Sequence, residues 1–316
     1  MGAWSNKIVS VVVATCANGG YLKKCLDSLT TQTYPEMEII VIDNSLDVSL
    51  SRDINMDYPF VKLYFSKDRL SYCKSLNKGI SLSSGNFILC LNDDSALDRS
   101  FIAEALRGFL LDSKVGIVSG KILRSDGKTI DSTGLFLSFF RTAKERGYGI
   151  QDKGQFDKAG FIFGVNGAVA FYRKELLEDI KQGEDYFDSD FHFFYEDLDI
   201  AWRAKRAGWK AYYIPPAIAY HVRGATLRLS CGINKPFARR FLSDELHLDL
   251  IKNRYLSIIK NESCLNFLLH LPGILLYDLG MWIYLLCFKA KLIKMFISST
   301  EYLNSALKKR GIAKNN

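Results

Sequence analysis

The sequence predicts an α/β fold, with a mostly parallel central sheet flanked by helices in a Rossmann-like arrangement and a helical extension at the C-terminal end. Over the first hundred residues, short runs rich in Val and Ile alternate with longer segments of helical period, as in the strand, helix, strand units of parallel sheets. After Pro236 the pattern is helical to the end. A chain of 316 residues that is 48% hydrophobic and 24% charged can form a full core, which excludes disordered and low-complexity classes.

The first half-domain is expected to contain four strands and two helices. In the first helix, Leu22, Leu26 and Leu29 recur at helical spacing and form one apolar face. Ligands of doubly wound sheets bind outside the carboxyl ends of the strands, so polar residues that follow the strands are candidates for the site. The predicted strands cover residues 8–14, 38–42, 61–65 and 87–91. One predicted helix begins at Gly19, and the other covers residues 70–82.

The pattern becomes less regular after Ser95. A helix is predicted over residues 101–111, followed by several short strands. Residues 144–160 are rich in Gly and Lys, and we expect a mobile loop there. A second helix is predicted over residues 196–207, where Gly208 ends it.

Positive charge is concentrated at the C-terminal end of the chain. The formal net charge is +8, from 42 Lys and Arg against 34 Asp and Glu. Residues 1–230 hold 29 basic and 28 acidic side chains, whereas residues 231–316 hold 13 and 6. Because the longer part is balanced, the excess does not indicate a nucleic-acid-binding domain. We expect the two parts to have different roles and no nucleic acid among the partners.

The cysteines and the N-terminus indicate a cytoplasmic protein. The seven cysteines are an odd number, without a C-x-x-C pair or a His at metal-site spacing, which is typical of free thiols in a reducing compartment. The N-terminal MGAWSNK leads directly into an apolar strand. It has none of the regions of a secretion signal.

Carboxylates beside apolar runs are the first candidates for chemistry. Asp43 follows the second strand, and Asp93 and Asp94 follow the fourth. Buried carboxylates are costly unless they are paired or bind a metal, and their oxygens suit a hard divalent cation that bridges phosphates. Asp pairs also occur in solvated turns and helix caps. Asp43, which precedes Asn44 and Ser45, fits an ordinary turn equally well.

A second acidic group opens the helix predicted from residue 196. Glu196 and Asp197 lie in its first turn, after the aromatic run HFFY. Acidic residues there complement the helix dipole, which alone would explain them. Poorly solvated aromatic surroundings would instead raise a carboxylate pKa toward that of a general base. The sequence leaves both interpretations open.

A third group, in HVRGAT, follows a short strand and the pair Pro215 and Pro216. His221, Arg223 and Thr226 surround Gly224 and could complete a metal shell and bind diphosphate oxygens. A lone His is also commonly a satisfied polar residue. Asn166 and Gly167 in the run FGVNGAVAFYR fit a turn between two strands as well as a binding site.

Taken in order, these segments resemble the inverting nucleotide-sugar glycosyltransferases of family two, and particularly their bacterial rhamnosyltransferase-like branch. The resemblance covers about residues 8–226 and implies a GT-A fold. It divides the chain into a catalytic domain at 1–230, with a nucleotide-binding half to about 98 and an acceptor half from 99, and a basic helical region at 231–316. The resemblance is carried by VSVVVATCANGGYLKKCLDSL from Val9, QTYPEMEIIVIDNS from Gln32, LNKGI from Leu76, LNDDS from Leu91, FGVNGAVAFYRKELL from Phe163, FDSDFHFFYEDLDIAWRAKRAGW from Phe187 and HVRGAT from His221.

The resemblance implies a role for each candidate residue. Two segments depart from the family pattern, namely CANG at Cys16 and residues 69–71. These departures affect the implied details of nucleobase binding more than the implied class of reaction. The nucleotide sugar would be bound by Thr15, Asp43, Asn77, Asp93, Arg223 and Thr226, Mg²⁺ or Mn²⁺ by Asp94 and His221, and the acceptor by Asn166, Gly167, Ala168 and Asp188, while Asp197, with Glu196 beside it, would be the general base.

The implied reaction transfers a sugar, rhamnose or another hexose, from a nucleotide-diphosphate sugar. The acceptor would be a hydroxyl of a saccharide or lipid-linked saccharide in cell-surface polysaccharide synthesis. During displacement at an anomeric carbon, charge develops on the attacking hydroxyl and on the departing diphosphate. A base would take the proton of the hydroxyl, and a cation would neutralise the diphosphate. A nucleotidyltransferase would share the carboxylates but needs a basic Gly-rich loop after the first strand, and CANGG has no Arg or Lys. A non-catalytic glycan-binding or scaffold protein is the other alternative.

The C-terminal region includes a stretch at 264–288 without Lys or Arg. It is long enough to span a bilayer, but His270, Pro272 and Asp278 interrupt it. We expect peripheral contact with the anionic inner face of the plasma membrane, and keep a buried helical subdomain or a homodimer interface as alternatives. Basic residues that suit an interfacial helix follow at Lys289, Lys291 and Lys294.

Overall fold

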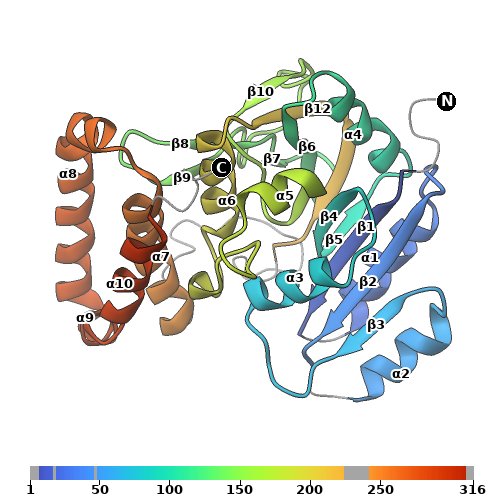
Figure 1. Cartoon of the computed structure of the whole chain (residues 1–316), viewed down its shortest axis with the longest axis horizontal. Helices are drawn as coiled ribbons and strands as arrows, with labels where there is room; N and C mark the ends of the chain where they lie inside the picture. Colours follow the sequence, from blue (N-terminus) through green and yellow to red (C-terminus); the bar gives the residue numbers. More distant parts are fainter. Residues whose placement is uncertain (1–6, 17–18, 46–47, 224–241, 311–316) are drawn as a thin grey trace.

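The computed structural model describes residues 7–16, 19–45, 48–223 and 242–310 (Figure 1). Its centre is a ten-stranded sheet, to which β5 (Ser95–Leu97) is joined through β12 and β7 (Ile130–Ser132) through β6. A separate hairpin pairs β8 (Leu135–Leu137) with β9 (Ala143–Glu145). The other strands lie in the order β10 (Gly160–Ile162), β12 (Lys210–His221), β6 (Val115–Arg124), β11 (Val169–Arg173), β4 (Phe87–Asn92), β1 (Val9–Thr15), β2 (Met37–Asp43) and β3 (Lys62–Phe65).

The strand directions bring polar residues to one edge of this sheet. Strands β3, β2, β1 and β4 are parallel, and β12 is parallel to β6, while β11 lies antiparallel between β4 and β6. The register pairs Thr15 with Asp43 and Ala14 with Asn92, so β1, β2 and β4 end together. The predicted mostly parallel α/β sheet is confirmed, and its carboxyl edge is where ligands of such sheets bind.

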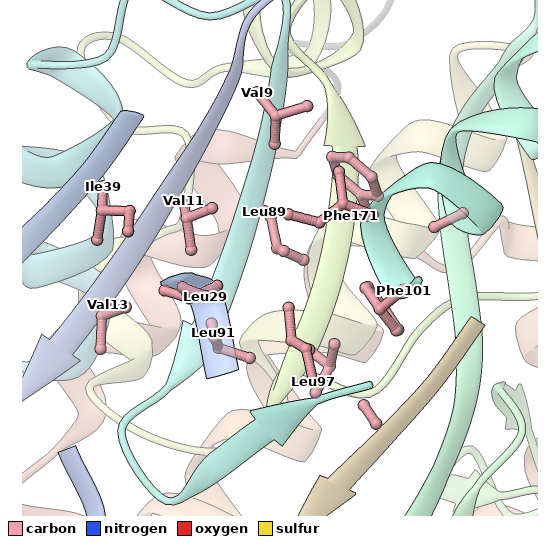
Figure 2. Packing of buried hydrophobic residues seen from close by; sticks show 14 of the residues in the cluster. Val9, Val11, Val13, Leu29, Ile39, Leu89, Leu91, Leu97, Phe101 and Phe171 are labelled. Atoms are coloured by element: carbon pink, nitrogen blue, oxygen red, sulfur yellow. The ribbon is translucent and has the colours of Figure 1, made fainter. Parts of the chain in front are cut away.

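Helices cover both faces of the sheet, which explains the continuous apolar runs of its strands. In β1, Val9, Val11 and Val13 face a cluster that includes Leu29 of α1 and Phe101 of α4 (Figure 2). The intervening Val12 belongs to a second cluster, formed with α3, α5 and α6. The helices of this domain are α1 (Gly19–Thr30), α2 (Val48–Asp57), α3 (Tyr72–Ser81), α4 (Phe101–Leu110), α5 (Lys174–Ile180) and α6 (Glu196–Arg206).

Four further helices form the predicted C-terminal extension. They are α7 (Asp244–Asn261), α8 (Cys264–Phe288), α9 (Ala290–Ile297) and α10 (Thr300–Lys309). Helix α7 contacts α6 and α10, whereas α8 lies at the outer edge of the group (Figure 1). Pro272 lies inside α8 without ending it. Among the described helices, α8 alone is long and apolar enough to cross a membrane by length and composition.

Two local features differ from the sequence prediction. Helix α2 was not predicted, because its sequence VSLSRDINMD shows little apolar periodicity. The segment expected to be a mobile loop at 144–160 is mostly a connection between β9 and β10, and ion pairs anchor it to the sheet. The buried ammonium of Lys121 holds this segment through Asp152 at 2.9 Å and Asp157 at 2.5 Å, and left-handed turns at Gly147, Gly149 and Gly154 allow its tight path.

Candidate active site

One cavity of about 1270 Å³ lies between the carboxyl edge of the sheet and the C-terminal helices. It gathers polar residues that are far apart in the sequence, and two of the three groups of candidate residues meet on its wall. Its polar wall includes Asn92, Glu145, Asn166, Gly167, Glu196, Asp197, His221 and Arg223.

Two buried carboxylates lie at the N-terminus of α6. The Oδ2 atom of Asp197 accepts a hydrogen bond from the amide of Gly167 at 3.0 Å, and Oδ1 accepts one from the amide of Leu198 at 2.7 Å. Burial raises the pKa of Asp197, and it raises the pKa of Glu196 well above the usual range, with the neighbouring Asp197 adding to the effect. Both carboxylates therefore hold a proton more readily than in water.

Gly167 allows the acceptor-side loop to approach these carboxylates. A Cβ atom at this position would lie 3.1 Å from Oε1 of Glu196, tighter than an ordinary contact. Asn166 shapes the same turn, since its Oδ1 accepts from the amide of Ala168 at 2.8 Å. Asn166, Gly167 and Ala168 all line the cavity, where the resemblance places acceptor-binding residues.

The segment before α6 has a strained backbone that the C-terminal extension holds in place. His192, Phe194 and Tyr195 have φ angles of 59°, 68° and 69°, which non-glycine residues rarely adopt. The side-chain amide of the buried Asn253 in α7 lies 2.7 Å from the carbonyl oxygen of Phe191 and 2.8 Å from those of Phe193 and Phe194. Helix α7 thereby orients the turn that leads to Glu196 and Asp197.

His221 lies between two carboxylates. Its Nε2 atom lies 3.2 Å from Oδ1 of Asp94, and its Nδ1 atom lies 2.9 Å from Oδ2 of Asp131. Burial alone would lower the pKa of His221, but the hydrogen bonds to Asp131 and Asp94 outweigh it and raise the pKa to about 9. The ring is therefore protonated at neutral pH in the absence of a competing cation.

Asp94 and His221 also fit a divalent cation. Ligands at about 2.1 Å from an octahedral ion and at right angles to each other lie about 3 Å apart, close to the separation of Nε2 and Oδ1. Asp131 on the other ring nitrogen is the partner that metal-bound histidines usually have. No group of three His, Cys, Asp or Glu side chains in the described ranges could hold a metal alone. A cation here would need further oxygens, such as those of a diphosphate.

Arg223 completes the positive side of the cavity. Its Nε donates to Oδ1 of Asp131, its Nη2 lies 3.9 Å from Oε1 of Glu145, and its guanidinium lies over the ring of Tyr148. Nη2 is buried and has no hydrogen-bond partner among the described residues. It is therefore available to an anionic ligand.

The nucleotide-side candidates meet at the ends of β1, β2 and β4. The hydroxyl of Thr15 donates to Oδ2 of Asp93 at 2.7 Å. Burial raises the pKa of Asp93 to about 6, and Asp94 contributes to the rise, although the Thr15 hydrogen bond opposes it. The buried Asp43 accepts from the amide of Ser45 at 2.9 Å and the hydroxyl of Ser51 at 2.6 Å.

The cavity wall does not include Thr15, Asp43, Asp93 or Asp94, which lie at the strand ends, and the structure places Asn77 and Asp188 away from it as well. Asn77 accepts from the amide of Phe187 at 2.8 Å and donates to the carbonyl of the same residue at 2.7 Å. The oxygens of Asp188 lie 2.5 Å from Nζ of both Lys260 and Lys309. Both side chains hold the segment before α6 rather than facing a ligand. Thr226 lies outside the described residues, as does the predicted domain boundary at 230 and 231.

A model of glycosyltransferase like family 2 matches residues 6–233 of the chain. The chain belongs to this glycosyltransferase family. It is similar to the poly-beta-1,6-N-acetyl-D-glucosamine synthase of Staphylococcus epidermidis, with 24% identity over 217 residues, 67% of this chain and 49% of the synthase. The synthase of Staphylococcus aureus strain MSSA476 is 22% identical over 224 residues, 69% of this chain and 51% of its own length. The chain spans about half the length of these curated relatives.

Solved structures show the same fold. GalNAc-T7 with UDP, GalNAc and Mn²⁺ has a TM-score of 0.60 at 14% identity, covering 80% of this chain and 48% of that one. The mannosyltransferase PcManGT from Pyrobaculum calidifontis, in complex with GDP-Man and Mn²⁺, has a TM-score of 0.54 at 16% identity, covering 97% and 88%. The predicted GT-A fold of this glycosyltransferase is confirmed.

Sequence reasoning missed three residues of the glycosyltransferase cavity and its surroundings. Asp131 links His221 to Arg223, and Tyr72 donates from its hydroxyl to Asn92 at 2.7 Å. Glu145 accepts from the side-chain amide of Asn166 at 2.5 Å. Burial raises the pKa of Glu145 to about 7, although Arg223 opposes the rise. Asp131 and Glu145 lie in short strands without a strong pattern, so only their acidic character within apolar surroundings could have indicated them.

Proposed function

We propose that this glycosyltransferase moves a sugar from a nucleotide-diphosphate sugar to a hydroxyl of a saccharide or lipid-linked saccharide in cell-surface polysaccharide synthesis. The reaction is a direct displacement that inverts the anomeric carbon. The observation that carries the proposal is the arrangement of one cavity, in which the buried carboxylate of Asp197 and the side chains of His221 and Arg223 line the same space. A base and a site for a departing anion are the two requirements of this reaction.

In this mechanism Asp197 removes the proton from the acceptor hydroxyl. Its raised pKa makes it a better base than an exposed carboxylate, and the amides of Gly167 and Leu198 fix its orientation. The acceptor oxygen forms its bond to the anomeric carbon from the face opposite the diphosphate. The bond from that carbon to the diphosphate breaks, and the diphosphate leaves with the electron pair.

The departing diphosphate is bound by the positive side of the cavity. The buried Nη2 of Arg223 is available to one of its oxygens. Asp94 and His221 would hold Mg²⁺ or Mn²⁺, and such a cation, when bound, neutralises charge on a diphosphate. Mn²⁺ in the complexes of GalNAc-T7 and PcManGT supports a divalent cation in this site.

Two donor sugars are proposed. Rhamnose is the first candidate, from the resemblance of about residues 8–226 to the rhamnosyltransferase-like branch. A nucleotide-linked N-acetylglucosamine is the second, because the curated relatives are named as N-acetylglucosamine polymer synthases. Asp43 and Asp93, at the ends of β2 and β4, are proposed to contact the nucleoside.

The glycosyltransferase is further proposed to lie on the cytoplasmic face of the plasma membrane. The outer surface of α8 supports this placement, since Leu265, Leu268 and Leu269 are 61% to 70% exposed, and lysines follow the helix at 289, 291 and 294. A homodimer through the C-terminal helices is the competing proposal for the same apolar surface.

Titration calorimetry of the full chain with UDP, GDP, dTDP and the corresponding triphosphates, with and without Mn²⁺, tests the donor site. We expect Mn²⁺-dependent binding of one nucleotide, which Asp94→Asn abolishes. Asp197→Asn should keep this binding and lower turnover of the nucleotide sugar by about 10²- to 10⁴-fold. Absence of nucleotide binding by the folded wild-type chain would overturn the proposal in favour of a glycan-binding or scaffold protein. Preference for triphosphates over diphosphates would favour a nucleotidyltransferase.

A further inference from the structure

The carboxylate of Glu145 lies between the two sides of the cavity, and the proposed mechanism gives it no role. Glu145 ends β9 and lines the cavity, with its side chain 17% exposed. Its Oε1 atom accepts from the side-chain amide of Asn166 at 2.5 Å and lies 3.9 Å from Nη2 of Arg223. Its Oε2 atom accepts from the hydroxyl of the buried Ser132. One side chain therefore lies beside the residue proposed to bind the diphosphate and beside the loop proposed to bind the acceptor.

On the donor side, Glu145 is not needed to give Arg223 a carboxylate partner. The fully buried Asp131 already accepts from Nε of Arg223. The 3.9 Å between Nη2 and Glu145 exceeds a hydrogen bond, so this second carboxylate attracts the guanidinium without occupying its donor. A second negative charge at this place lowers the affinity of the cavity for an anion. Weaker binding of the departing diphosphate favours its release, the step that limits turnover in many enzymes.

On the acceptor side, the contacts of Glu145 lead to Asp197. Asn166 donates from its Nδ2 to Glu145, and its Oδ1 accepts from the amide of Ala168 at 2.8 Å. The intervening Gly167 donates from its amide to Oδ2 of Asp197 at 3.0 Å. Because both ends of the Asn166 amide group are held, the turn presents the Gly167 amide to Asp197 in one orientation. Without Glu145, the Nδ2 end would lose this anchor.

We propose that Glu145 is a positioning residue that acts on both sides of the transfer. On the donor side, its charge limits how tightly Arg223 holds the diphosphate. On the acceptor side, its hydrogen bond from Asn166 keeps the Gly167 amide on the base, Asp197. This inference rests on the proposed function, which assigns the diphosphate to Arg223 and the proton transfer to Asp197.

Glu145→Gln tests the charge, because glutamine has the same length and can keep both hydrogen bonds. UDP, GDP and dTDP are titrated by calorimetry into the full chain with Mn²⁺, and the nucleotide that binds the wild type is used throughout. A pH of about 8 keeps Glu145 ionised, since burial raises its pKa to about 7. We expect Glu145→Gln to bind this nucleotide about threefold more tightly than the wild type. The constant for its inhibition of donor hydrolysis should fall by the same factor.

Asn166→Ala tests the hydrogen bond and leaves the charge of Glu145 in place. We expect the Kd for the nucleotide to change less than about twofold, while kcat for donor hydrolysis falls at least about tenfold, because Asp197 is less well oriented. Glu145→Ala removes both the charge and the hydrogen bond. It should therefore combine the tighter nucleotide binding with the lower kcat.

The matched control is Glu104→Gln in α4, which also removes one negative charge. Glu104 is 19% exposed and pairs with Arg107 at 2.9 Å, but it does not line the cavity. Its Kd for the nucleotide and its kcat should both stay within about twofold of the wild-type values. Circular dichroism with thermal unfolding is recorded for every variant.

The outcomes distinguish this inference from the proposed function. Unchanged or weaker nucleotide binding in Glu145→Gln would overturn the donor-side role, and an unchanged kcat in Asn166→Ala would overturn the acceptor-side role. If Glu145→Gln loses nucleotide affinity, kcat and thermal stability together, or does not fold, Glu145 only supports the fold. A wild-type chain that binds a nucleotide while its variants show no such split keeps the proposed function and loses this inference. A folded wild-type chain that binds no nucleotide loses both.

Discussion

Helices α7 and α8 are neighbours in the chain, and they invert the usual relation between polarity and burial. Most of the buried residues of α7 are polar or charged, among them Lys252, Asn253 and Lys260. Helix α8 is apolar over its 25 residues, yet only Gly273, Ile274 and Leu285 are buried. Charged groups are seldom buried unless they are paired, and large exposed apolar surfaces usually have a partner.

The difference shows that the two helices serve different neighbours. The polar side chains of α7 are paired with the segment that precedes Glu196 and Asp197, through Asn253 and through Lys260. Helix α7 therefore supports the candidate active site and lines its cavity, although it lies in the basic extension. Many apolar side chains of α8, such as Leu265, Leu268 and Leu279, are exposed, and we assign them to lipid.

Among the substitutions that test this difference between α7 and α8, Lys260→Met in α7 is expected to change the free energy of unfolding most. The ammonium of Lys260 lies 2.5 Å from Asp188 and 3.0 Å from Asp199, and all three side chains are buried. Removing it leaves two buried carboxylates with fewer partners, so the free energy of unfolding should fall by about 3 kcal/mol. Urea denaturation followed by circular dichroism measures this change.

The control for this substitution is Lys291→Met in α9, since Lys291 pairs with Asp244 at 3.2 Å but is 75% exposed. We expect no measurable change in stability there, because solvent screens exposed pairs. A similar loss of stability in both variants would show that the buried ion pairs of Lys260 stabilise the chain no more than the exposed pair of Lys291.

The second prediction concerns Asn253→Ala, which removes the amide that holds three carbonyl oxygens before α6. Leaving these groups without a partner should destabilise the chain by about 2 kcal/mol. Because Asp197 is then less well oriented, kcat should fall at least tenfold while KM for the nucleotide sugar changes little. Steady-state kinetics of transfer or donor hydrolysis measures the two constants. A fall in stability without any change in kcat would show that α7 only supports the fold.

The third prediction is that the contacts of α7 make the stability of the chain depend on pH, whereas the contacts of α8 do not. Burial alone would raise the pKa values of Asp188 and Asp199, but Lys260, together with Lys309 and Arg203, lowers both below the ordinary range. A carboxylate with a lowered pKa in the folded state contributes stability above its unfolded pKa of about 3.9. This contribution is lost as the pH falls through the folded value.

Thermal unfolding measured between pH 3 and pH 7 should therefore show decreasing stability in the wild-type chain below about pH 4. In Lys260→Met the decrease should be shallower, because the main cause of the lowered pKa is gone. Leu275→Gln in α8 should leave the slope unchanged. Parallel slopes in wild type and Lys260→Met would contradict the assigned role of the ion pairs.

These contacts also show how far the sequence could predict the site. Alternating Val and Ile runs and the order of the motifs predicted the sheet, and the structure confirms that His221 lies beside Asp94. The same patterns could not predict that Asn253 reaches the loop before α6, because that contact joins residues about 60 positions apart. Glu145 could not be predicted because it ends a strand of three residues at the start of a Gly- and Lys-rich segment without apolar periodicity. The role of Asp188 depends on Lys260 and Lys309, which no local pattern connects to it.

The smallest effect on stability, and the sharpest contrast with α7, is expected from Leu279→Gln in α8. Leu279 is 60% exposed, so the free energy of unfolding should change by less than about 0.5 kcal/mol. Binding to vesicles that contain anionic phosphatidylglycerol should nevertheless weaken several-fold, because the side chain no longer enters the acyl boundary. Leu110→Gln in α4, where Leu110 is 54% exposed, is the matched control, and co-sedimentation should show no change for it. If both variants bind vesicles like the wild type while the wild type sediments as a dimer that Leu279→Gln dissociates, a second copy of the chain covers α8, and the contrast with α7 is one between two protein interfaces.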